Sequence, residues 1–188
     1  MSIKLRNVTF SYKDTPVLKN FSLEVKSGEA VALKGESGSG KTSIARLILG
    51  LERTNEGEVI APKKVAAVFQ EDRLLPTLTV RKNISIVAKE NDKTEELLKR
   101  ANLESVADKK LWHLSGGMKR RVAILRAINF GGEAIILDEA FNGIDSENKR
   151  LMAELIKEEY RDKPILLISH IKEDADLLNA RTVILEKI

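Results

Sequence analysis

The feature that most constrains this chain is a glycine-rich octapeptide between an apolar run and a helical pattern. The apolar run is Ala30–Leu33, and apolar side chains recur at helical spacing from Ile44 to Leu51. The octapeptide consists of Gly35, Glu36, Ser37, Gly38, Ser39, Gly40, Lys41 and Thr42. A strand, a loop of the form G-x-x-x-x-G-K-[ST] and a helix, in this order, place backbone N–H groups and a helix N-terminus around a phosphate group. The order predicts a phosphate-binding loop.

The residue types in this loop also suit a nucleotide with a magnesium ion. Glycines let successive backbone N–H groups turn toward phosphate oxygens. Lys41 is long enough to reach the β- and γ-phosphates, and the hydroxyl of Thr42 is a ligand that Mg²⁺ accepts. Ser43 continues the same helix start. We predict that the loop and Ser43 bind ATP, with Thr42 as a ligand of Mg²⁺.

Two adjacent carboxylates follow a second apolar run. The run Ala134–Leu137 predicts a buried strand, and Asp138 and Glu139 come directly after it. Alone this pattern is weak, because many strands end in acids. Downstream of a complete phosphate loop it is the expected partner, with Asp138 as a metal ligand and Glu139 as the residue that polarises water. We therefore predict ATP hydrolysis.

The remaining apolar patterns indicate short strands separated by helices. The predicted strands are residues 5–10, 21–25, 65–69, 165–168 and 183–185, and the predicted helices are residues 79–110, 118–125 and 152–156. Asp92 and Glu95 form a plausible capping box for a helix in the first of these helical spans. Short buried strands alternating with helices predict an α/β domain with a mainly parallel sheet, preceded by a small β-rich region.

Composition narrows the class further. The chain has 188 residues, 43% hydrophobic and 32% charged, which suits one folded domain. The net charge of +4 comes from 32 basic residues dispersed among 28 acids, so it gives no argument for nucleic acid. The absence of cysteine excludes disulfides and cysteine-ligated metals. Neither a signal-peptide pattern at Met1–Leu5 nor an apolar run of ~20 residues is present, so we expect other chains to span any membrane at which it works.

A third segment carries the resemblance to a known family. Leu114–Val122 reads Leu-Ser-Gly-Gly-Met-Lys-Arg-Arg-Val and closely resembles the signature motif of ATP-binding cassette (ABC) proteins. Ser115, Gly116 and Gly117 open a helix and so offer a second phosphate site by the same N–H and dipole logic. The resemblance implies that two copies pair head to tail. Each signature then closes over the ATP held by the other copy's phosphate loop.

The resemblance covers nearly the whole chain and implies both a fold and further site residues. The implied fold is an ABC-type P-loop NTPase, with a parallel sheet core, a small N-terminal antiparallel β region and a short helical subdomain. The chain is then a single domain, residues 1–188, with the helical subdomain inserted at about residues 71–128. The residues implied are Tyr12 stacking on adenine, Val17 beside the base, Gln70 sensing Mg²⁺ and the attacking water, Glu139 as general base, Asp145 in the loop linking the two sites, and His170 contacting the γ-phosphate.

Other features near these motifs receive plainer predictions. We expect Lys119, Arg120 and Arg121 to form a solvated helix face, with contact to phosphate or a partner as the lesser alternative. Trp112 and His113 are expected to pack near the signature. Met118 and Ala140 stand where the family usually has glutamine and proline. Lys41 to Gln70 and Gln70 to Ser115 are short spacings for the family, so we expect trimmed β-rich and helical regions and no C-terminal regulatory domain.

Three uses of such an ATPase compete. The first is the ATP-binding subunit of a membrane transporter, cytoplasmic and peripheral on the inner face of the cell membrane, with separate transmembrane permease subunits as partners. The segment Phe69–Pro76 resembles that of bacterial importer ATPases for small anions, which favours this use. The second is a soluble ABC ATPase acting on ribosomes or DNA, and the third is a scaffold without activity. A soluble ABC ATPase usually has two cassettes or long insertions, and an inactive scaffold would lack catalytic residues; this sequence shows neither pattern. We therefore favour transport. We expect no nucleic acid partner, and we expect a second copy or a related ABC subunit to complete the dimer.

Overall fold

A five-stranded parallel sheet forms the centre of the molecule. The computed structural model describes residues 1–88 and 92–188. The strands run in the order β5-β6-β7-β3-β8, and every neighbouring pair is parallel. They are β3 (Ala30–Lys34), β5 (Val65–Val68), β6 (Ala134–Asp138), β7 (Ile165–Ile168) and β8 (Arg181–Ile184). The predicted parallel α/β core is confirmed, and the carboxyl ends of its strands meet at one edge, where ligands of such sheets bind.

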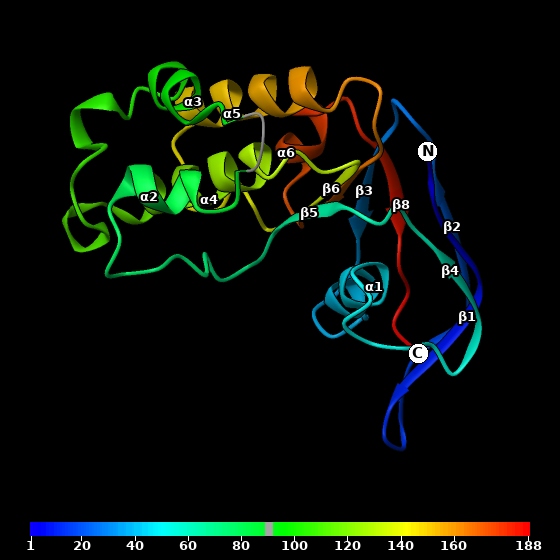
Figure 1. Cartoon of the computed structure of the whole chain (residues 1–188). Coiled ribbons are helices and arrows are strands. Elements are labelled where there is room, and N and C mark those ends of the chain that lie inside the picture. Colours follow the sequence, from blue (N-terminus) through cyan, green and yellow to red (C-terminus); the bar gives the residue numbers. More distant parts are fainter. Residues whose placement is uncertain (89–91) are drawn as a thin grey trace.

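A second sheet is antiparallel and three-stranded. Its strands are β1 (Ile3–Tyr12), β2 (Thr15–Val25) and β4 (Glu56–Ile60), in the order β2-β1-β4. Figure 1 shows this sheet on one side of the molecule, with the helical region at the opposite end. The strand β4 was not predicted, because its sequence contains two acids and a glycine and lacks an alternating apolar pattern. It joins the sheet through pairing with β1, more than forty residues earlier in the chain.

Six α-helices connect these strands within the described residues. They are α1 (Lys41–Ile48), α2 (Val80–Ser85), α3 (Thr94–Arg100), α4 (Gly116–Asn129), α5 (Ser146–Glu159) and α6 (Lys172–Leu177). Short 3₁₀ turns occur at Glu104–Val106 and Leu111–His113. The helices α2, α3 and α4 lie in the long connection between β5 and β6, which the sequence predicted to be helical. The predicted helix over residues 79–110 is therefore two helices and a 3₁₀ turn, and residues 89–91 lie outside the described part.

Two local predictions were wrong in detail. Helix α1 ends at Ile48, so Leu51 lies beyond it and is 52% exposed. The predicted capping box is absent from α3, because the carboxylate of Asp92 accepts hydrogen bonds from the backbone and hydroxyl of Thr94 and not from Glu95. Glu95 instead pairs with Arg81.

The core has two parts that meet at the parallel sheet. One packs α1 against the antiparallel sheet and one face of the parallel sheet, with Val8, Leu33 and Ile44 fully buried. The other packs α2 to α5 around the opposite face, with Phe141 and Tyr160 fully buried. A sheet covered on both faces explains the continuous apolar strand sequences. No helix in residues 1–88 and 92–188 has both the length and the apolar character that crossing a bilayer requires.

Candidate nucleotide-binding site

The glycine-rich loop ends at Gly40, the N-cap of α1. Gly40 has φ 99°, a left-handed conformation that favours glycine, and a Cβ there would lie 2.8 Å from Cγ1 of Val17. Val17 therefore packs directly on the loop. No side chain caps this helix and its first turn has no acidic residue. The N-terminus of α1 thus keeps free N–H groups and an uncompensated positive dipole end, which suit an anionic ligand.

Lys41 lies folded into the same loop. Its Nζ donates hydrogen bonds to the backbone oxygens of Gly35 and Glu36, at 2.8 and 2.7 Å, and lies 3.4 Å from Oγ of Ser39. These contacts hold the ammonium group against the backbone of the loop. A phosphate oxygen arriving there finds a positive charge already in place, which is the preorganisation that electrostatic stabilisation requires.

Asp138 ends strand β6 and faces the start of α1. The hydroxyl of Thr42 donates a hydrogen bond to Oδ2 of Asp138 at 3.2 Å. Asp138 is 3% exposed, and burial raises the pKa of its carboxyl, while the Thr42 hydrogen bond acts in the opposite direction. A bound cation would restore the preference of this carboxyl for its charged form.

Glu139 follows Asp138 and presents both of its carboxylate oxygens to polar neighbours. Its backbone has φ 50°, an uncommon left-handed conformation for a residue with a side chain. Nδ1 of His170 lies 3.1 Å from Oε1 of Glu139, and Nδ2 of Asn142 donates a hydrogen bond to Oε2 at 3.2 Å. The backbone N–H of Glu139 donates to the oxygen of Ile168 at 2.8 Å. The Glu139 carboxylate therefore lies between Asn142, three residues later in the same turn, and His170, which follows β7.

A cavity of about 600 Å³ connects these elements. Its lining includes most of the predicted site residues: Tyr12, Val17, Gly35, Ser37, Gly38, Gly40, Lys41, Thr42, Ser43, Gln70, Asp138, Glu139 and His170. Asn142 and Ile168 also line it and were not predicted as site residues. Tyr12 is 42% exposed at the rim, with its ring edge-on to Phe10 at 4.8 Å. The cavity thus runs from an exposed aromatic ring, past the phosphate loop, to the carboxylates.

The other predicted site residues lie outside this cavity. Glu36 and Ser39 belong to the loop and contact Lys41, but they do not line the cavity. The signature residues Ser115, Gly116 and Gly117, together with Asp145, do not line the cavity either. This chain therefore gathers the phosphate loop and the carboxylates in one place and holds its signature elsewhere.

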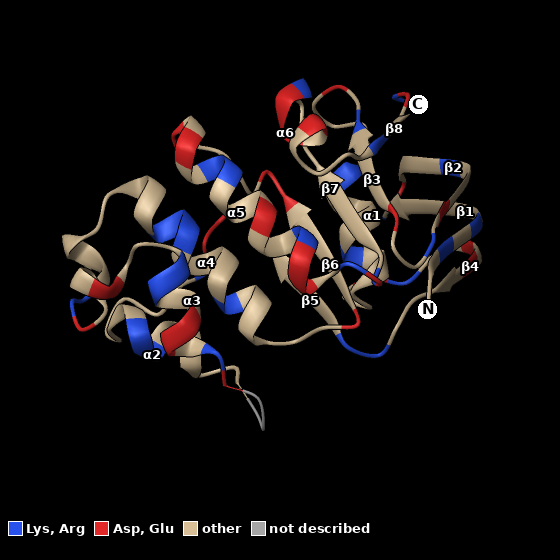
Figure 2. Cartoon of the chain, turned by 90° about the horizontal axis from the view of Figure 1, so that it is seen from above, with Lys and Arg blue, Asp and Glu red and all other residues tan. Residues whose placement is uncertain are grey.

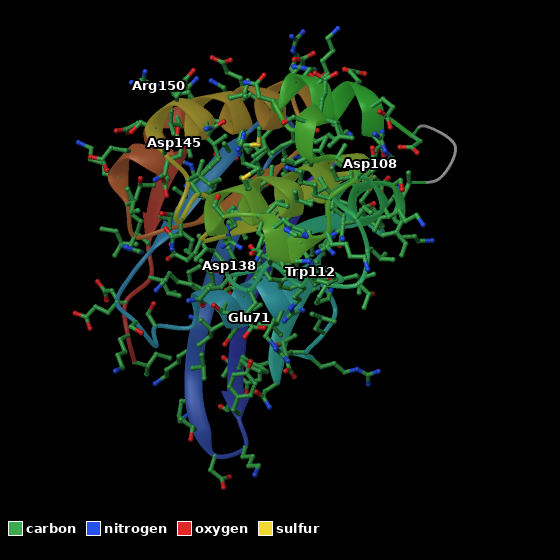
Figure 3. All side chains as sticks on the ribbon, turned by 90° about the vertical axis from the view of Figure 1, so that its left-hand side faces the viewer. Glu71, Asp108, Trp112, Asp138, Asp145 and Arg150 are labelled. Carbon is green, nitrogen blue, oxygen red and sulfur yellow. The ribbon has the colours of Figure 1, made fainter. Side chains whose placement is uncertain are left out.

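The signature forms the start of helix α4 on an exposed face. Oγ of Ser115 accepts a hydrogen bond from the backbone N–H of Met118 at 3.2 Å and so caps the helix. A Cβ on Gly117 would lie 2.5 Å from the backbone oxygen of Gly143, so only glycine allows this close approach of α4 to the 142–145 loop. Asp145 caps α5 in the same way, and hydrogen bonds from Asn148 lower the pKa of its carboxyl. Figure 3 shows Asp138 and Asp145 in one view of this side of the molecule.

The oxygen atoms at the phosphate loop fit a magnesium ion. Thr42 and Asp138 supply a hydroxyl and a carboxylate side by side, and Gln70 lines the same cavity. No set of three or more histidine, aspartate or glutamate side chains is placed to hold a metal within the described ranges. Mg²⁺ held by phosphates needs only one or two protein ligands, so these donors suit it.

The prediction of a solvated Lys119-Arg120-Arg121 face was wrong. Arg120 is 4% exposed and Arg121 is also buried. Arg121 donates hydrogen bonds to the oxygen of Ala101 and to Oδ1 of Asn148, at 2.8 and 2.7 Å. A run of three cations usually marks solvent, but a buried guanidinium is stable where carbonyl oxygens satisfy its five N–H groups. Trp112, expected to pack near the signature, is 59% exposed.

The fold and the site together define a class. A phosphate loop between a strand and a helix of a parallel sheet, with an acid pair at the end of a neighbouring strand, is the arrangement of P-loop nucleoside triphosphatases. The family model described as ABC transporter matches residues 18–142. The chain belongs to the ABC transporter family, as an ATP-binding subunit with ATPase activity.

Named relatives and solved structures agree with this family. The chain is 37% identical to "Aliphatic sulfonates import ATP-binding protein SsuB 3" from Rhodococcus jostii, over 99% of this chain and 72% of that protein. It is 35% identical to "Nod factor export ATP-binding protein I" from Rhizobium meliloti, over 99% of this chain and 62% of that protein. The structure "Dimeric structure of a post-hydrolysis state of the ATP-binding cassette MJ0796 bound to ADP and Pi" has a TM-score of 0.87 and 30% identity, covering 98% of this chain and 96% of that one.

Proposed function

We propose that this chain powers a membrane transporter by binding and hydrolysing Mg-ATP between two head-to-tail copies. The observation that carries the proposal is the separation of the signature from the cavity: Ser115 and Gly116 are exposed and line no part of it. In a head-to-tail pair, the exposed helix start of one copy would close the cavity of the other copy, and a two-fold axis would repeat this contact. The relatives are named as transport ATP-binding proteins, for import and for export.

The reaction is in-line attack of water on the γ-phosphorus of ATP, which breaks the bond to the bridging oxygen of ADP. Glu139 accepts the proton of the attacking water as general base, with His170 and Asn142 fixing its two oxygens. Lys41 neutralises charge on the γ-phosphate and His170 contacts the same group. Thr42 and Asp138 would hold a Mg²⁺ ion, which would neutralise phosphate charge, and Gln70, which lines the same cavity, would orient the attacking water.

A permease segment is the partner that the remaining surface suits. An apolar groove of about 280 Å³ lies along the edge strand β5, beside the Phe69–Pro76 segment, and its lining includes Leu51, Val65, Phe69, Val87 and Phe130. Exposed leucine at such an edge fits an apolar partner helix. Figure 2 shows acidic and basic segments following one another along α5, which gives no continuous basic surface there for nucleic acid. We place the chain on the cytoplasmic face of the membrane, bound through this groove.

The docking site is tested with matched surface substitutions. Leu51→Asp should abolish co-purification of a multi-span membrane protein from detergent-solubilised membranes while leaving the ATPase rate of the isolated chain unchanged. Ile184→Asp, at a residue that is 74% exposed on β8, is the control and should retain the partner. Equal recovery of the membrane protein with both variants would refute the groove as the docking site.

The hydrolytic dimer is tested with Glu139→Gln. Loss of a general base should reduce kcat by ~10²–10⁴-fold. ATP binding should remain, because the phosphate loop is untouched, so this variant should accumulate as an ATP-bound dimer in sedimentation or light-scattering measurements. Undiminished hydrolysis would remove Glu139 from its role, and a variant that stays monomeric with saturating ATP would contradict the sandwich.

A further inference from the structure

The buried guanidinium of Arg120 links two segments that were predicted to act separately. Nη1 of Arg120 donates a hydrogen bond to the backbone oxygen of Phe69 at 2.7 Å and contacts Oδ1 of Asp72 at 3.0 Å. Nη2 donates to the backbone oxygens of Asp138 at 3.3 Å and Glu139 at 2.5 Å. One side chain on α4 therefore binds Phe69 and Asp72, which flank Gln70 and Glu71 in the chain, and the backbone of the carboxylate pair at the end of β6.

These contacts fall on backbone that needs support. Glu139 has φ 50°, a left-handed conformation that is unfavourable for a residue with a side chain and persists only where its surroundings fix it. Arg73 has φ 47° and lies with its guanidinium 3.8 Å from the ring of Phe69. Arg126, one and a half turns after Arg120 on the same helix, donates to the backbone oxygens of Asp72 and Arg73 at 2.9 and 2.8 Å. The turn that carries Gln70 is thus held from one side by α4.

We infer that Arg120 is a positioning residue that sets the catalytic geometry of Glu139 and Gln70 together. Glu139 has its backbone oxygen bound by Arg120 and its carboxylate bound by His170 and Asn142. If the backbone shifts, the carboxylate moves with it. Gln70 directly follows Phe69 and lies, with Glu71, between the Phe69 oxygen and the Asp72 carboxylate that Arg120 binds. One guanidinium fork therefore fixes the distance between the base and the residue that orients the water.

Lysine cannot replace this fork. An ammonium group on a flexible stem is a single point donor, whereas the planar guanidinium bonds two separated groups at fixed spacing. Arg120 has no hydrogen bond to the phosphate loop, so its loss should affect the chemical step more than ATP binding. Misplacement of catalytic groups by about 1 Å lowers rates by up to ~10²-fold without any change in binding contacts. This inference rests on the proposed role of Glu139 as general base.

The test compares Arg120→Lys with Asn129→Ala in the full chain. Asn129 lies on the same helix, is buried, and bonds Ile84, Asp92 and Thr94, remote from the carboxylate pair. Arg120→Lys should lower kcat by ~10-fold or more, with the dissociation constant for ATP within about twofold of the wild type. Asn129→Ala should lower Tm by at least as much as Arg120→Lys does, but it should keep the kcat of the wild type.

Two further variants keep the outcome decisive. Wild-type kcat in a folded Arg120→Lys, or an equal loss of kcat in Asn129→Ala, would overturn the inference. If Arg120→Lys does not fold, Asp72→Ala removes one acceptor of the fork and should lower kcat severalfold at unchanged ATP affinity, and unchanged kcat would overturn the inference. Glu139→Gln, measured in parallel, separates the two ideas: if it still hydrolyses ATP, the proposed mechanism fails, and if it stalls while Arg120→Lys is normal, only the inference fails.

Discussion

Helices α1 and α4 begin in similar ways but face different surroundings. Each starts at a glycine-containing motif and neither has an acidic residue in its first turn. The start of α1 lies inside the cavity, with no side-chain cap and with Lys41 folded over it. The start of α4 is capped by Ser115 and exposed, away from the cavity. The difference teaches that two similar helix starts have different surroundings: among the described residues, the start of α1 lines the cavity and the start of α4 does not.

The largest effect in this comparison is expected on ATP hydrolysis, when a substitution blocks the exposed start of α4. Ser115→Arg should reduce ATP hydrolysis by ~10²–10³-fold, because the signature would no longer supply hydrogen-bond donors to a phosphate held by a partner copy. ATP affinity of the isolated chain should not change, since Ser115 lines no part of its cavity. Steady-state hydrolysis and equilibrium nucleotide binding measure the two quantities separately.

A matched substitution controls for added charge and bulk. Glu104→Arg places an arginine on an exposed 3₁₀ turn of the same helical region and should keep full activity. If Ser115→Arg weakened ATP binding by the free monomer, the two helix starts would serve one cavity and the comparison would be broken.

The next effect is expected at the internal start. Lys41→Ala removes a charged donor to phosphate, which is worth ~1.5–3 kcal/mol and lowers ATP affinity about 10- to 100-fold. Titration of the purified variant with a fluorescent ATP analogue measures this loss. Lys19→Ala, at an exposed position on β2, should bind ATP normally. Unchanged affinity in Lys41→Ala would discredit the phosphate-loop assignment.

The smallest expected effect is on thermal stability, and it concerns Asp138, which faces the start of α1. Burial raises the pKa of the Asp138 carboxyl, so ionised Asp138 destabilises the ligand-free fold, and this loss grows as pH rises above the ordinary aspartate range of about 4. Asp138→Asn should therefore raise Tm at neutral pH, with the difference shrinking in acid. Thermal unfolding across pH checks the sign. A variant less stable than the wild type at neutral pH would show that Asp138 supports the fold.

The sequence predicted most of the core because the relevant patterns are local. Apolar runs such as Ala134–Leu137 and the loop ending in Lys41 and Thr42 each contain their own evidence for strand, turn or helix. The strand β4 was not predicted, because its pairing partner β1 is distant in the sequence and most of its own residues are polar. An isolated edge strand carries no periodic signal, so tertiary pairing decided its conformation.

The burial of Arg120 was not predicted for a related reason. Its four acceptors belong to Phe69, Asp72, Asp138 and Glu139, which no local pattern connects to α4. Within Lys119-Arg120-Arg121 nothing distinguishes a buried cation from a solvated one. The sequence offered one indication of burial: Arg120 comes about one turn after Gly117, near the start of a helix that must pack on the sheet.

The most direct measurement of the central claim mixes two variants, Lys41→Ala and Ser115→Arg, at an ATP concentration that fills the intact phosphate loop and leaves the Lys41→Ala loop largely empty. In a head-to-tail dimer of one chain of each kind, one site joins an intact phosphate loop to an intact signature. Random pairing should then restore about a quarter of wild-type ATPase activity, since half of the dimers are mixed and each has one of its two sites intact. Recovery near this level, dependent on total protein concentration, is the result that the account predicts. Activity no greater than the sum of the two variants measured alone would contradict it.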